Sequence, residues 1–262
     1  LPGNILYELV NNDRIIGGMT KQCADKALKI YKFFCKGNCF VTSARTAEMC
    51  KLVENSFRDV NIAFANELSI VCDKLDVEVR ELISLANRHP RVNILAPGPG
   101  VGGHCIAVDP WFLISQVPDD TKLIRCARDT NIYKPIWVFE KIKEGILKFR
   151  NNNKSLNREI YVGCLGMTYK ADTDDLRESP SIDIINLLSK IKRVKILAYD
   201  PYVNKLPEGI NTSNVKIVST SEIINKSDIL VFLVPHKDFK KLEIKNDRLI
   251  VDVCGVTNQD II

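Results

Sequence analysis

The stretch E-I-Y-V-G-C-L, residues 159–165, is the first of four short apolar runs that decide the fold of the second half of this chain. The other runs, also rich in valine and isoleucine, are residues 194–199, 229–234 and 249–253. Segments with helical character lie between the runs, near residues 180–190, 221–225 and 239–242. Because strands alternate with helices, we expect a parallel sheet with helices on both faces.

Ligands of such sheets bind beyond the carboxyl ends of the strands. Those ends carry residues 166–170, Asp200, residues 235–236 and Cys254. Lys170 and Arg177 stand at the end of the first run and near the start of the next helix, where anions bind, although a charged surface loop is the alternative interpretation of each. Ser179 and Pro180 form an N-cap and N1 pair for that helix.

The first half of the chain has a different pattern. Residues 46–75 lack proline and glycine and carry apolar residues at helical spacing, which predicts a long helix. Further helices are expected at residues 79–86 and 122–149, with a kink or break at Pro135. We therefore expect an α/β chain in three parts: an α/β remnant at 1–43, a central all-α domain at 44–150, and a Rossmann-like parallel-sheet domain at 151–262.

The composition excludes several classes of protein. The chain has 262 residues, is 45% hydrophobic and 26% charged, and carries a formal charge of +5 without a basic stripe for nucleic acid. No apolar run approaches the roughly 18 residues of a membrane span. Nine cysteines without a C-x-x-C pair argue against a disulfide framework or a metal site and favour a reducing, cytoplasmic location. The chain begins with Leu rather than Met, as if cut from a longer protein.

A glycine-rich loop, P-G-P-G-V-G-G-H-C-I-A-V-D-P, occupies residues 97–110 and contains the spacing G-x-G-x-x-G. A dinucleotide fingerprint needs a strand before it and a helix after it. Residues 92–95 allow a short strand, but two β-branched residues and Pro110 make a poor first helical turn. The loop therefore either brings bare backbone close to a ligand and presents Cys105, or is an ordinary turn with a buried thiol.

A polar stripe lies on the predicted long helix. Lys51, Asn55 and Arg58 are spaced i, i+4, i+7, and further polar residues stand beside them: Glu48, Asp59 and Asn66. A solvated helix face is one interpretation. The other is a functional face, because a lysine near a cysteine can act as an acid/base group or stabilise an oxyanion.

Three motifs, taken together and in order, resemble the UDP-sugar 6-dehydrogenase family. They are T-A-E-M-C-K-L-V-E-N-S-F-R-D-V-N-I-A-F-A-N-E at 46–67, the glycine loop at 97–110, and K-A-D-T-D-D-L-R-E-S-P at 170–180. The sequences H-C-I-A-V-D-P and N-R-H-P-R-V-N-I are most similar to the N-acetylhexosamine branch, in particular to members that act on UDP-N-acetyl-D-mannosamine. UDP-N-acetylglucosamine and UDP-glucose are the alternative substrates.

The resemblance implies two successive NAD-dependent oxidations at C6 of the sugar. Cys105 would be the nucleophile, through a thiohemiacetal and a thioester. Lys51 would be the acid/base group, while Asn55 and Asp109 would position the oxyanion and water.

The resemblance also implies binding residues and a partner. The expected substrate contacts are Arg58, His89, Arg91, Gly102, Tyr169 and Lys170. Arg177 would contact NAD, and the long central helix would build a homodimer.

Two departures from the family pattern limit what this chain does. The N-terminal dinucleotide-binding domain of the family, with its catalytic glutamate, is missing, so we expect the chain alone to be an inactive fragment. The last strand ends in D-V-C-G-V, which puts Cys254 where the family has a substrate-binding Lys. The alternative to a fragment of an enzyme is a non-catalytic, dimeric remnant that binds UDP-sugar.

Overall fold

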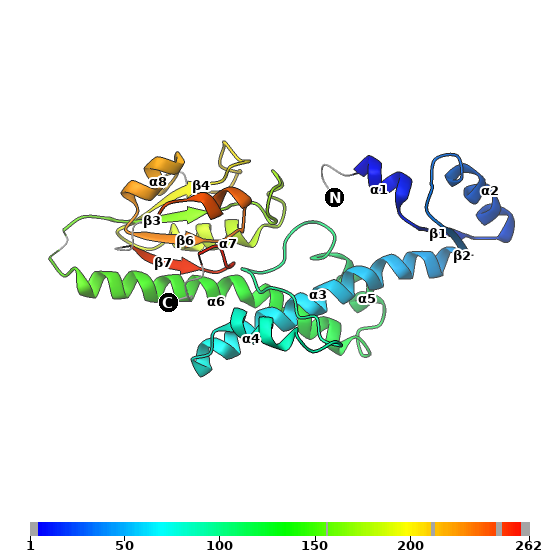
Figure 1. The fold of residues 1–262 in the computed structure, drawn as a ribbon, viewed down its shortest axis with the longest axis horizontal. Coiled ribbons are helices and arrows are strands. Elements are labelled where there is room, and N and C mark those ends of the chain that lie inside the picture. The colour runs from blue at the N-terminus through cyan, green and yellow to red at the C-terminus, as the bar shows by residue number, and fades with distance from the viewer. Residues whose placement is uncertain (1–4, 156, 211–212, 245–247, 258–262) are drawn as a thin grey trace. The chain divides into compact units, whose positions relative to one another are not determined.

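The computed structural model describes residues 5–155, 157–210, 213–244 and 248–257. It comprises two units, Leu1–Phe57 and Arg58–Ile262, and the boundary between them falls within helix α3 (Ala44–Leu75) (Figure 1). The long helix predicted for residues 46–75 is therefore present, and it belongs to both units.

The first unit is a small α/β arrangement. Its elements before α3 are α1 (Ile5–Asn11), β1 (Arg14–Gly18), α2 (Lys21–Tyr31) and β2 (Cys39–Ser43). The two strands pair in parallel, from Arg14 opposite Cys39 to Gly18 opposite Ser43. The hydroxyl of Thr20 caps α2 by accepting a hydrogen bond from the amide of Cys23. The α/β character expected for this end of the chain is thus confirmed.

The helical part of the second unit follows α3. It contains α4 (Val79–Ala86), α5 (Asp109–Gln116) and α6 (Lys122–Asn152). Pro135 lies inside α6 without ending it, so it makes no break, and a kink there stays a prediction. The short strand that residues 92–95 allowed is absent, since these residues, all of which the structure describes, form no strand.

Helix α5 was missed because Pro110 was interpreted as a helix breaker. Pro110 follows Asp109 in the first turn of α5. A proline in the first turn has no intrahelical hydrogen bond to lose, and its fixed φ suits the helix. The glycine loop is therefore followed by a helix, but only after the turn that carries Cys105.

The sheet of the second unit has five parallel strands in the order β5-β4-β3-β6-β7. The strands are β3 (Ile160–Leu165), β4 (Val194–Tyr199), β5 (Val215–Ile217), β6 (Ile229–Phe232) and β7 (Leu249–Asp252). The connecting helices are α7 (Pro180–Leu188), α8 (Thr220–Lys226) and the 3-10 helix η1 (Lys237–Lys241). The four predicted apolar runs became strands, whereas the three-residue β5 was not predicted.

The sheet is covered on both faces, as the sequence predicted. On one face, α7 and the second half of α6 pack against the strands through buried residues such as Trp137, Ile142 and Ile185 (Figure 1). On the other face, Ile223 of α8 and Phe239 of η1 cover the strands. Helix α6 therefore connects the helical part of the second unit to the core of its sheet.

The strand order creates a switch point in the sheet. The chain runs from β3 outward through β4 to β5, and then returns to place β6 on the other side of β3. At such points the loops after neighbouring strands diverge and leave a crevice at the carboxyl edge, where ligands bind. The loops after β3 and β6 flank this crevice.

Candidate functional site

Cys105 lies in the turn that leads into α5. Its carbonyl oxygen accepts hydrogen bonds from the amides of Val108 at 3.1 Å and Asp109 at 2.8 Å. The thiol is half-buried, and Sγ lies 3.6 Å from Nε2 of the exposed His104. Two residues predicted to be catalytic, Cys105 and Asp109, are thus held in one turn at the start of a helix.

The glycine loop docks against the loop between β3 and α7. The amide of Gly103 donates a hydrogen bond to the carbonyl oxygen of Arg177 at 3.0 Å. A Cβ at Gly102 would lie 2.3 Å from the carbonyl oxygen of Glu178, and Gly103, at φ +78, faces the ring of Tyr169 with a would-be Cβ at 2.9 Å. These glycines therefore admit a second loop of the same chain, and a contact of Gly102 with substrate stays a prediction.

This docking brings several predicted site residues into one electrostatic environment. Burial is the main cause that raises the pKa of the Tyr169 hydroxyl; charges on Asp175 and Cys105 also raise it, while Arg177 and Arg58 lower it. Tyr169 is therefore close enough to the thiol and to both guanidinium groups for their charges to act on it. Because both guanidinium groups are positively charged, an anionic ligand can bind beside the Cys105 thiol and the Tyr169 hydroxyl.

Arg177 is already paired with a carboxylate. Its Nη2 lies 2.6 Å from Oδ2 of Asp175, and this interaction is the main cause of the lowered pKa of Asp175. The side chain of Arg177 is 60% exposed, so it can still turn to a ligand. Ser179 occupies the N-cap position of α7, but its hydroxyl donates to the carbonyl oxygen of Met167 at 2.7 Å instead of capping the helix.

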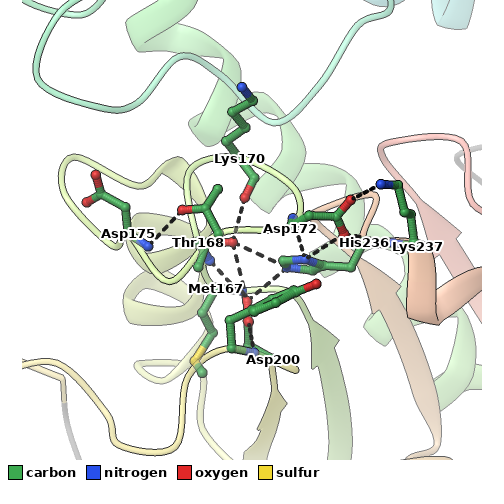
Figure 2. A network of polar contacts seen from close by, with 10 residues as sticks. Met167, Thr168, Lys170, Asp172, Asp175, Asp200, His236 and Lys237 are labelled. Carbon is green, nitrogen blue, oxygen red and sulfur yellow. Dashed lines mark hydrogen bonds and ion pairs between the residues drawn. The ribbon is translucent and has the colours of Figure 1, made fainter. Parts of the chain in front are cut away.

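A buried histidine holds the β3–α7 loop in place (Figure 2). His236 follows β6, and its Nε2 lies 3.1 Å from Oδ2 of Asp200, which follows β4. Nδ1 of His236 accepts a hydrogen bond from the amide of Asp172 at 3.0 Å, which places the imidazole proton on Nε2. Oδ2 of Asp200 also accepts from the amides of Met167 and Thr168 at 2.7 Å and 3.2 Å.

This network closes the carboxyl edge of the sheet at the switch point. It joins the loops after β3, β4 and β6, and so fixes the backbone that carries Tyr169 and Lys170. The side chain of Lys170 points away from the network (Figure 2) and is exposed. The sequence had marked Asp200 and His236 only as residues at strand ends, because their partners lie on separate loops.

A second buried network lies between α3 and α6 and was missed by the sequence analysis. Its members are Asp59, Asn66, Ser69, Arg128, Asn131 and Lys134, all at most 3% exposed. Asp59 and Asn66, interpreted from sequence as part of a polar stripe, are thus core residues. The three-residue spacing R-x-x-N-x-x-K at 128–134 was the available signal, because it places three polar groups on one helix face.

Lys51 and Asn55 belong to the first unit. Lys51 is exposed and lines a cavity of about 380 Å³ together with Arg14, Phe40 and Glu54. Asn55 is 3% exposed. That these two residues act on Cys105 stays a prediction.

His89 and Arg91 are exposed residues of the turn that follows α4. The amide of Arg91 donates to Nδ1 of His89 at 3.3 Å. Both residues thus lie just beyond the C-terminus of α4, and a role in substrate binding stays a prediction.

A further cation, missed by the sequence analysis, lies beside the end of the last strand. Sγ of Cys254 donates to the carbonyl oxygen of Phe232 at 3.5 Å, and burial raises the pKa of this thiol well above its ordinary value. Nη2 of Arg80, on α4, donates to the carbonyl oxygen of Asp252 at 2.6 Å. Its Nε would lie 2.8 Å from a Cβ at Gly255. Arg80 thus brings a guanidinium next to the position where the resemblance predicts a lysine.

Within the described ranges, no group of three or more His, Cys, Asp or Glu side chains could hold a metal ion. The search of the described helices for one that is long and apolar enough to span a membrane found none.

Comparisons with known proteins match most of the chain. Residues 45–133 match the central domain of the UDP-glucose/GDP-mannose dehydrogenase family. Residues 163–259 match the UDP binding domain of the same family. The first of these matches contains Cys105, and the second contains Tyr169 and Lys170.

Individual relatives cover nearly all of this chain. A UDP-N-acetyl-D-mannosamine dehydrogenase of Campylobacter jejuni is 52% identical over 251 residues, which are 95% of this chain and 59% of the relative. An NDP-N-acetyl-D-galactosaminuronic acid dehydrogenase of Ralstonia nicotianae is 48% identical over 98% of this chain and 59% of its own length. The chain therefore spans about six tenths of the length of these relatives.

Solved structures show the same relationship. A UDP-N-acetyl-mannosamine dehydrogenase from Staphylococcus aureus superposes with a TM-score of 0.81 at 42% identity, covering 99% of this chain and 59% of that one. One from Pyrococcus horikoshii gives 0.82 at 36% identity, covering 100% and 60%. Since two domain models of one family account for well over half of the residues, the chain belongs to the UDP-glucose/GDP-mannose dehydrogenase family.

Proposed function

We propose that this chain is part of an NAD-dependent enzyme that oxidises C6 of UDP-N-acetyl-D-mannosamine to the carboxylate. The observation that carries the proposal is the docking of the Cys105 turn on the loop of Tyr169 and Arg177, in which a half-buried thiol lies beside a phenol and a guanidinium. The names of the relatives support the substrate, since several that are 46–52% identical are UDP-N-acetyl-D-mannosamine dehydrogenases.

Cys105 is the nucleophile of the proposed reaction. Its thiolate adds to the C6 aldehyde, so that an S–C6 bond forms and the carbonyl electron pair moves to oxygen. Lys51 gives the proton that this oxygen takes up and removes it again before the thioester forms. Asn55 and Asp109 orient the oxyanion and the water that attacks the thioester. Breaking of the S–C6 bond releases the uronate and returns the thiolate.

The UDP-sugar is bound by polar and charged side chains from both halves of the second unit. Arg58, His89 and Arg91 come from the helical part, and Tyr169 and Lys170 come from the sheet part. Guanidinium and ammonium groups form charge-assisted hydrogen bonds with phosphate oxygens, which suits a diphosphate. The match of residues 163–259 to a UDP binding domain supports this assignment.

One described residue fits NAD. The guanidinium of Arg177 is 60% exposed and acts on the charge of Cys105, so it can contact an anionic cofactor beside the thiol. NAD, when bound, would supply the oxidant, with two NAD molecules in succession each taking one hydride from C6. A single cation does not orient a nicotinamide ring, so we propose that these 262 residues alone do not turn over substrate.

A homodimer through the long helix completes the proposal. Helix α3 leaves Phe64 and Val71 56% and 43% exposed, and exposed apolar side chains on one helix favour a protein interface. Size-exclusion chromatography with light scattering on the purified chain should give twice the monomer mass, and a monomer at all concentrations would remove the dimer from the proposal.

The activity is tested with a chimera in which this chain replaces the matching region of the Campylobacter jejuni relative. NADH absorbance should rise with UDP-N-acetyl-D-mannosamine, and Lys51→Ala should slow it by about a hundredfold or more. UDP-N-acetylglucosamine, UDP-N-acetylgalactosamine and UDP-glucose are compared in parallel. If UDP-N-acetylgalactosamine is oxidised fastest, the result would favour an N-acetylgalactosamine sugar as substrate, as the name of the Ralstonia relative suggests.

The chain alone serves as the second arm of this test. With NAD and the same sugar nucleotides it should bind UDP-sugar in a calorimeter and form no NADH. A chimera that binds UDP-sugar but oxidises none of the four would favour a non-catalytic, UDP-sugar-binding protein instead.

A further inference from the structure

The segment from Gly98 to Ile106, which carries Cys105, has neither helix nor strand. Its backbone therefore lacks the regular hydrogen bonds that hold a helix or a sheet, and other groups must hold it. Side chains from the core of the helical part reach both of its ends. At one end, the amide of Gly98 donates to Oδ1 of Asn66 at 2.9 Å. At the other, Nη1 of Arg128 lies 3.5 Å from the carbonyl oxygen of Ile106.

Asn66 and Arg128 belong to one continuous network. Nδ2 of Asn66 donates to Oδ1 of Asn131 at 2.9 Å, and Nδ2 of Asn131 donates to Oδ1 of Asp59 at 2.8 Å. Arg128 completes the network with a 2.6 Å contact from Nη1 to the same oxygen of Asp59. The four side chains are buried between α3 and α6 and are bonded to one another. A movement of either helix would therefore displace the groups that contact Gly98 and Ile106.

Packing of two helices does not by itself require this arrangement. A buried ion pair is often no more stabilising than apolar side chains of similar volume. Among the described residues, Oδ2 of Asp59 and Nε of Arg128 are buried without a hydrogen-bond partner. Burial also raises the pKa of Asp59 despite the adjacent guanidinium. The network is therefore costly, and its contacts outside the two helices are with the Cys105 segment.

We propose that Asp59, Asn66, Arg128 and Asn131 are positioning residues that hold the Cys105 segment at both ends and thereby set the exposure of the thiol. The inference rests on the proposed function only in giving that thiol a catalytic role. The positioning itself concerns the reactivity of one cysteine and is measurable without NAD or sugar.

The experiment measures alkylation by iodoacetamide at single cysteines, by peptide mass spectrometry on the folded 262-residue chain. The exposed Cys126 is the internal reference. Asn66→Ala should speed alkylation of Cys105 by roughly threefold to tenfold, the factor expected from loss of one hydrogen bond, and leave Cys126 unchanged. Gly98→Pro removes the amide donor from the loop side and should act in the same way without touching the packing of α3 on α6.

Two controls separate positioning from a general loss of stability. Gly98→Ala keeps the amide, and nothing lies within 4 Å of its Cβ, so Cys105 should react as in the unmodified chain. Ile142→Val removes a methyl group from a buried side chain of α6 and should lower the melting temperature. It should not change the ratio of the alkylation rates of Cys105 and Cys126. The inference is overturned if Gly98→Pro leaves the alkylation rate of Cys105 relative to Cys126 unchanged, or if Ile142→Val raises that ratio as much as Gly98→Pro does. Either result counts even if Asn66→Ala does not fold. The proposed function fails by a different result, an active chimera that lacks Cys105.

Discussion

The amide of Gly103 lies 3.0 Å from the carbonyl oxygen of Arg177, and this hydrogen bond joins two loops that are far apart in the sequence. One loop carries Cys105 and the other carries Tyr169 and Lys170. The thiol predicted to be the nucleophile and residues predicted to bind UDP-sugar therefore share one edge of the second unit. The contact is possible because the positions that meet the second loop are glycines.

Gly102→Ala should disturb this contact. The added Cβ would lie 2.3 Å from the carbonyl oxygen of Glu178 and 2.6 Å from Cβ of Tyr169, so backbone has to move. We expect a loss of stability of about 1–3 kcal/mol and weaker binding of UDP, measured by thermal unfolding and calorimetry. Gly98→Ala is the matched control and should change stability by less than about 0.5 kcal/mol. Equal effects at the two glycines would contradict the docking of the loops.

Cys105→Ala should abolish formation of uronate by the chimera. The reason is that no other group would form the thioester, whereas binding of UDP-sugar should persist. Mass spectrometry of the product is the measurement. Cys126→Ala removes an exposed thiol from α6 and should leave the rate unchanged. Uronate made at the original rate by the Cys105 variant would remove the nucleophile from the proposal.

Lys134→Met should change how stability depends on pH. Burial lowers the pKa of Lys134 from 10.5 to about 7, while Asp73 opposes the shift. Between these two values the unfolded chain holds one more proton than the folded chain, so stability rises with pH through this window. The variant lacks this titration. The amount by which its free energy of unfolding exceeds that of the original chain should be largest near neutral pH and shrink toward the upper end of the window.

Urea unfolding across that pH range is the measurement for Lys134. Lys148→Met, at an exposed position of the same helix, should leave the pH dependence intact. If the free energy of unfolding depends on pH in the same way for Lys134→Met and the original chain, Lys134 is not a buried, neutralised amine.

Asp200→Asn should weaken the sheet part most near neutral pH. Burial raises the pKa of Asp200, but hydrogen bonds from His236 and from the amides of Met167 and Tyr202 lower it more, so the pKa lies below its ordinary value of 3.8. The folded chain then binds the proton less readily than the unfolded chain. The stabilisation is complete above that ordinary value and is lost as pH falls through the folded pKa.

Thermal unfolding from neutral to acidic pH measures this effect. At neutral pH the Asp200 variant should lose about 1–3 kcal/mol, because its buried partners are left less well satisfied, and the difference should narrow in acid. Asp174→Asn, an exposed residue of the neighbouring loop, is the control and should show no such narrowing. A constant difference at all pH values would argue against a charged Asp200 in the network.

Much of the fold follows from local pattern. Strands β3, β4, β6 and β7 were predicted because strands of a parallel sheet buried on both faces have continuous apolar runs. The long helix was predicted from periodicity without a breaker. Strand β5 was missed because three residues are too few for a pattern. Helix α5 was missed because Pro110 favours the first helical turn and opposes any later one.

The sequence by itself determined the family, the parallel sheet, the long helix and the nucleophile candidate Cys105, because residues close together in the chain carry these signals. Only the tertiary structure decided that Gly102 and Gly103 face another loop, that Asp59 and Asn66 are buried, and that His236 holds the loop of Tyr169. The physical reason is that the burial and pairing of a polar side chain depend on groups brought near it by folding. Spacing along the chain shows which face of a helix a residue occupies, but not what covers that face.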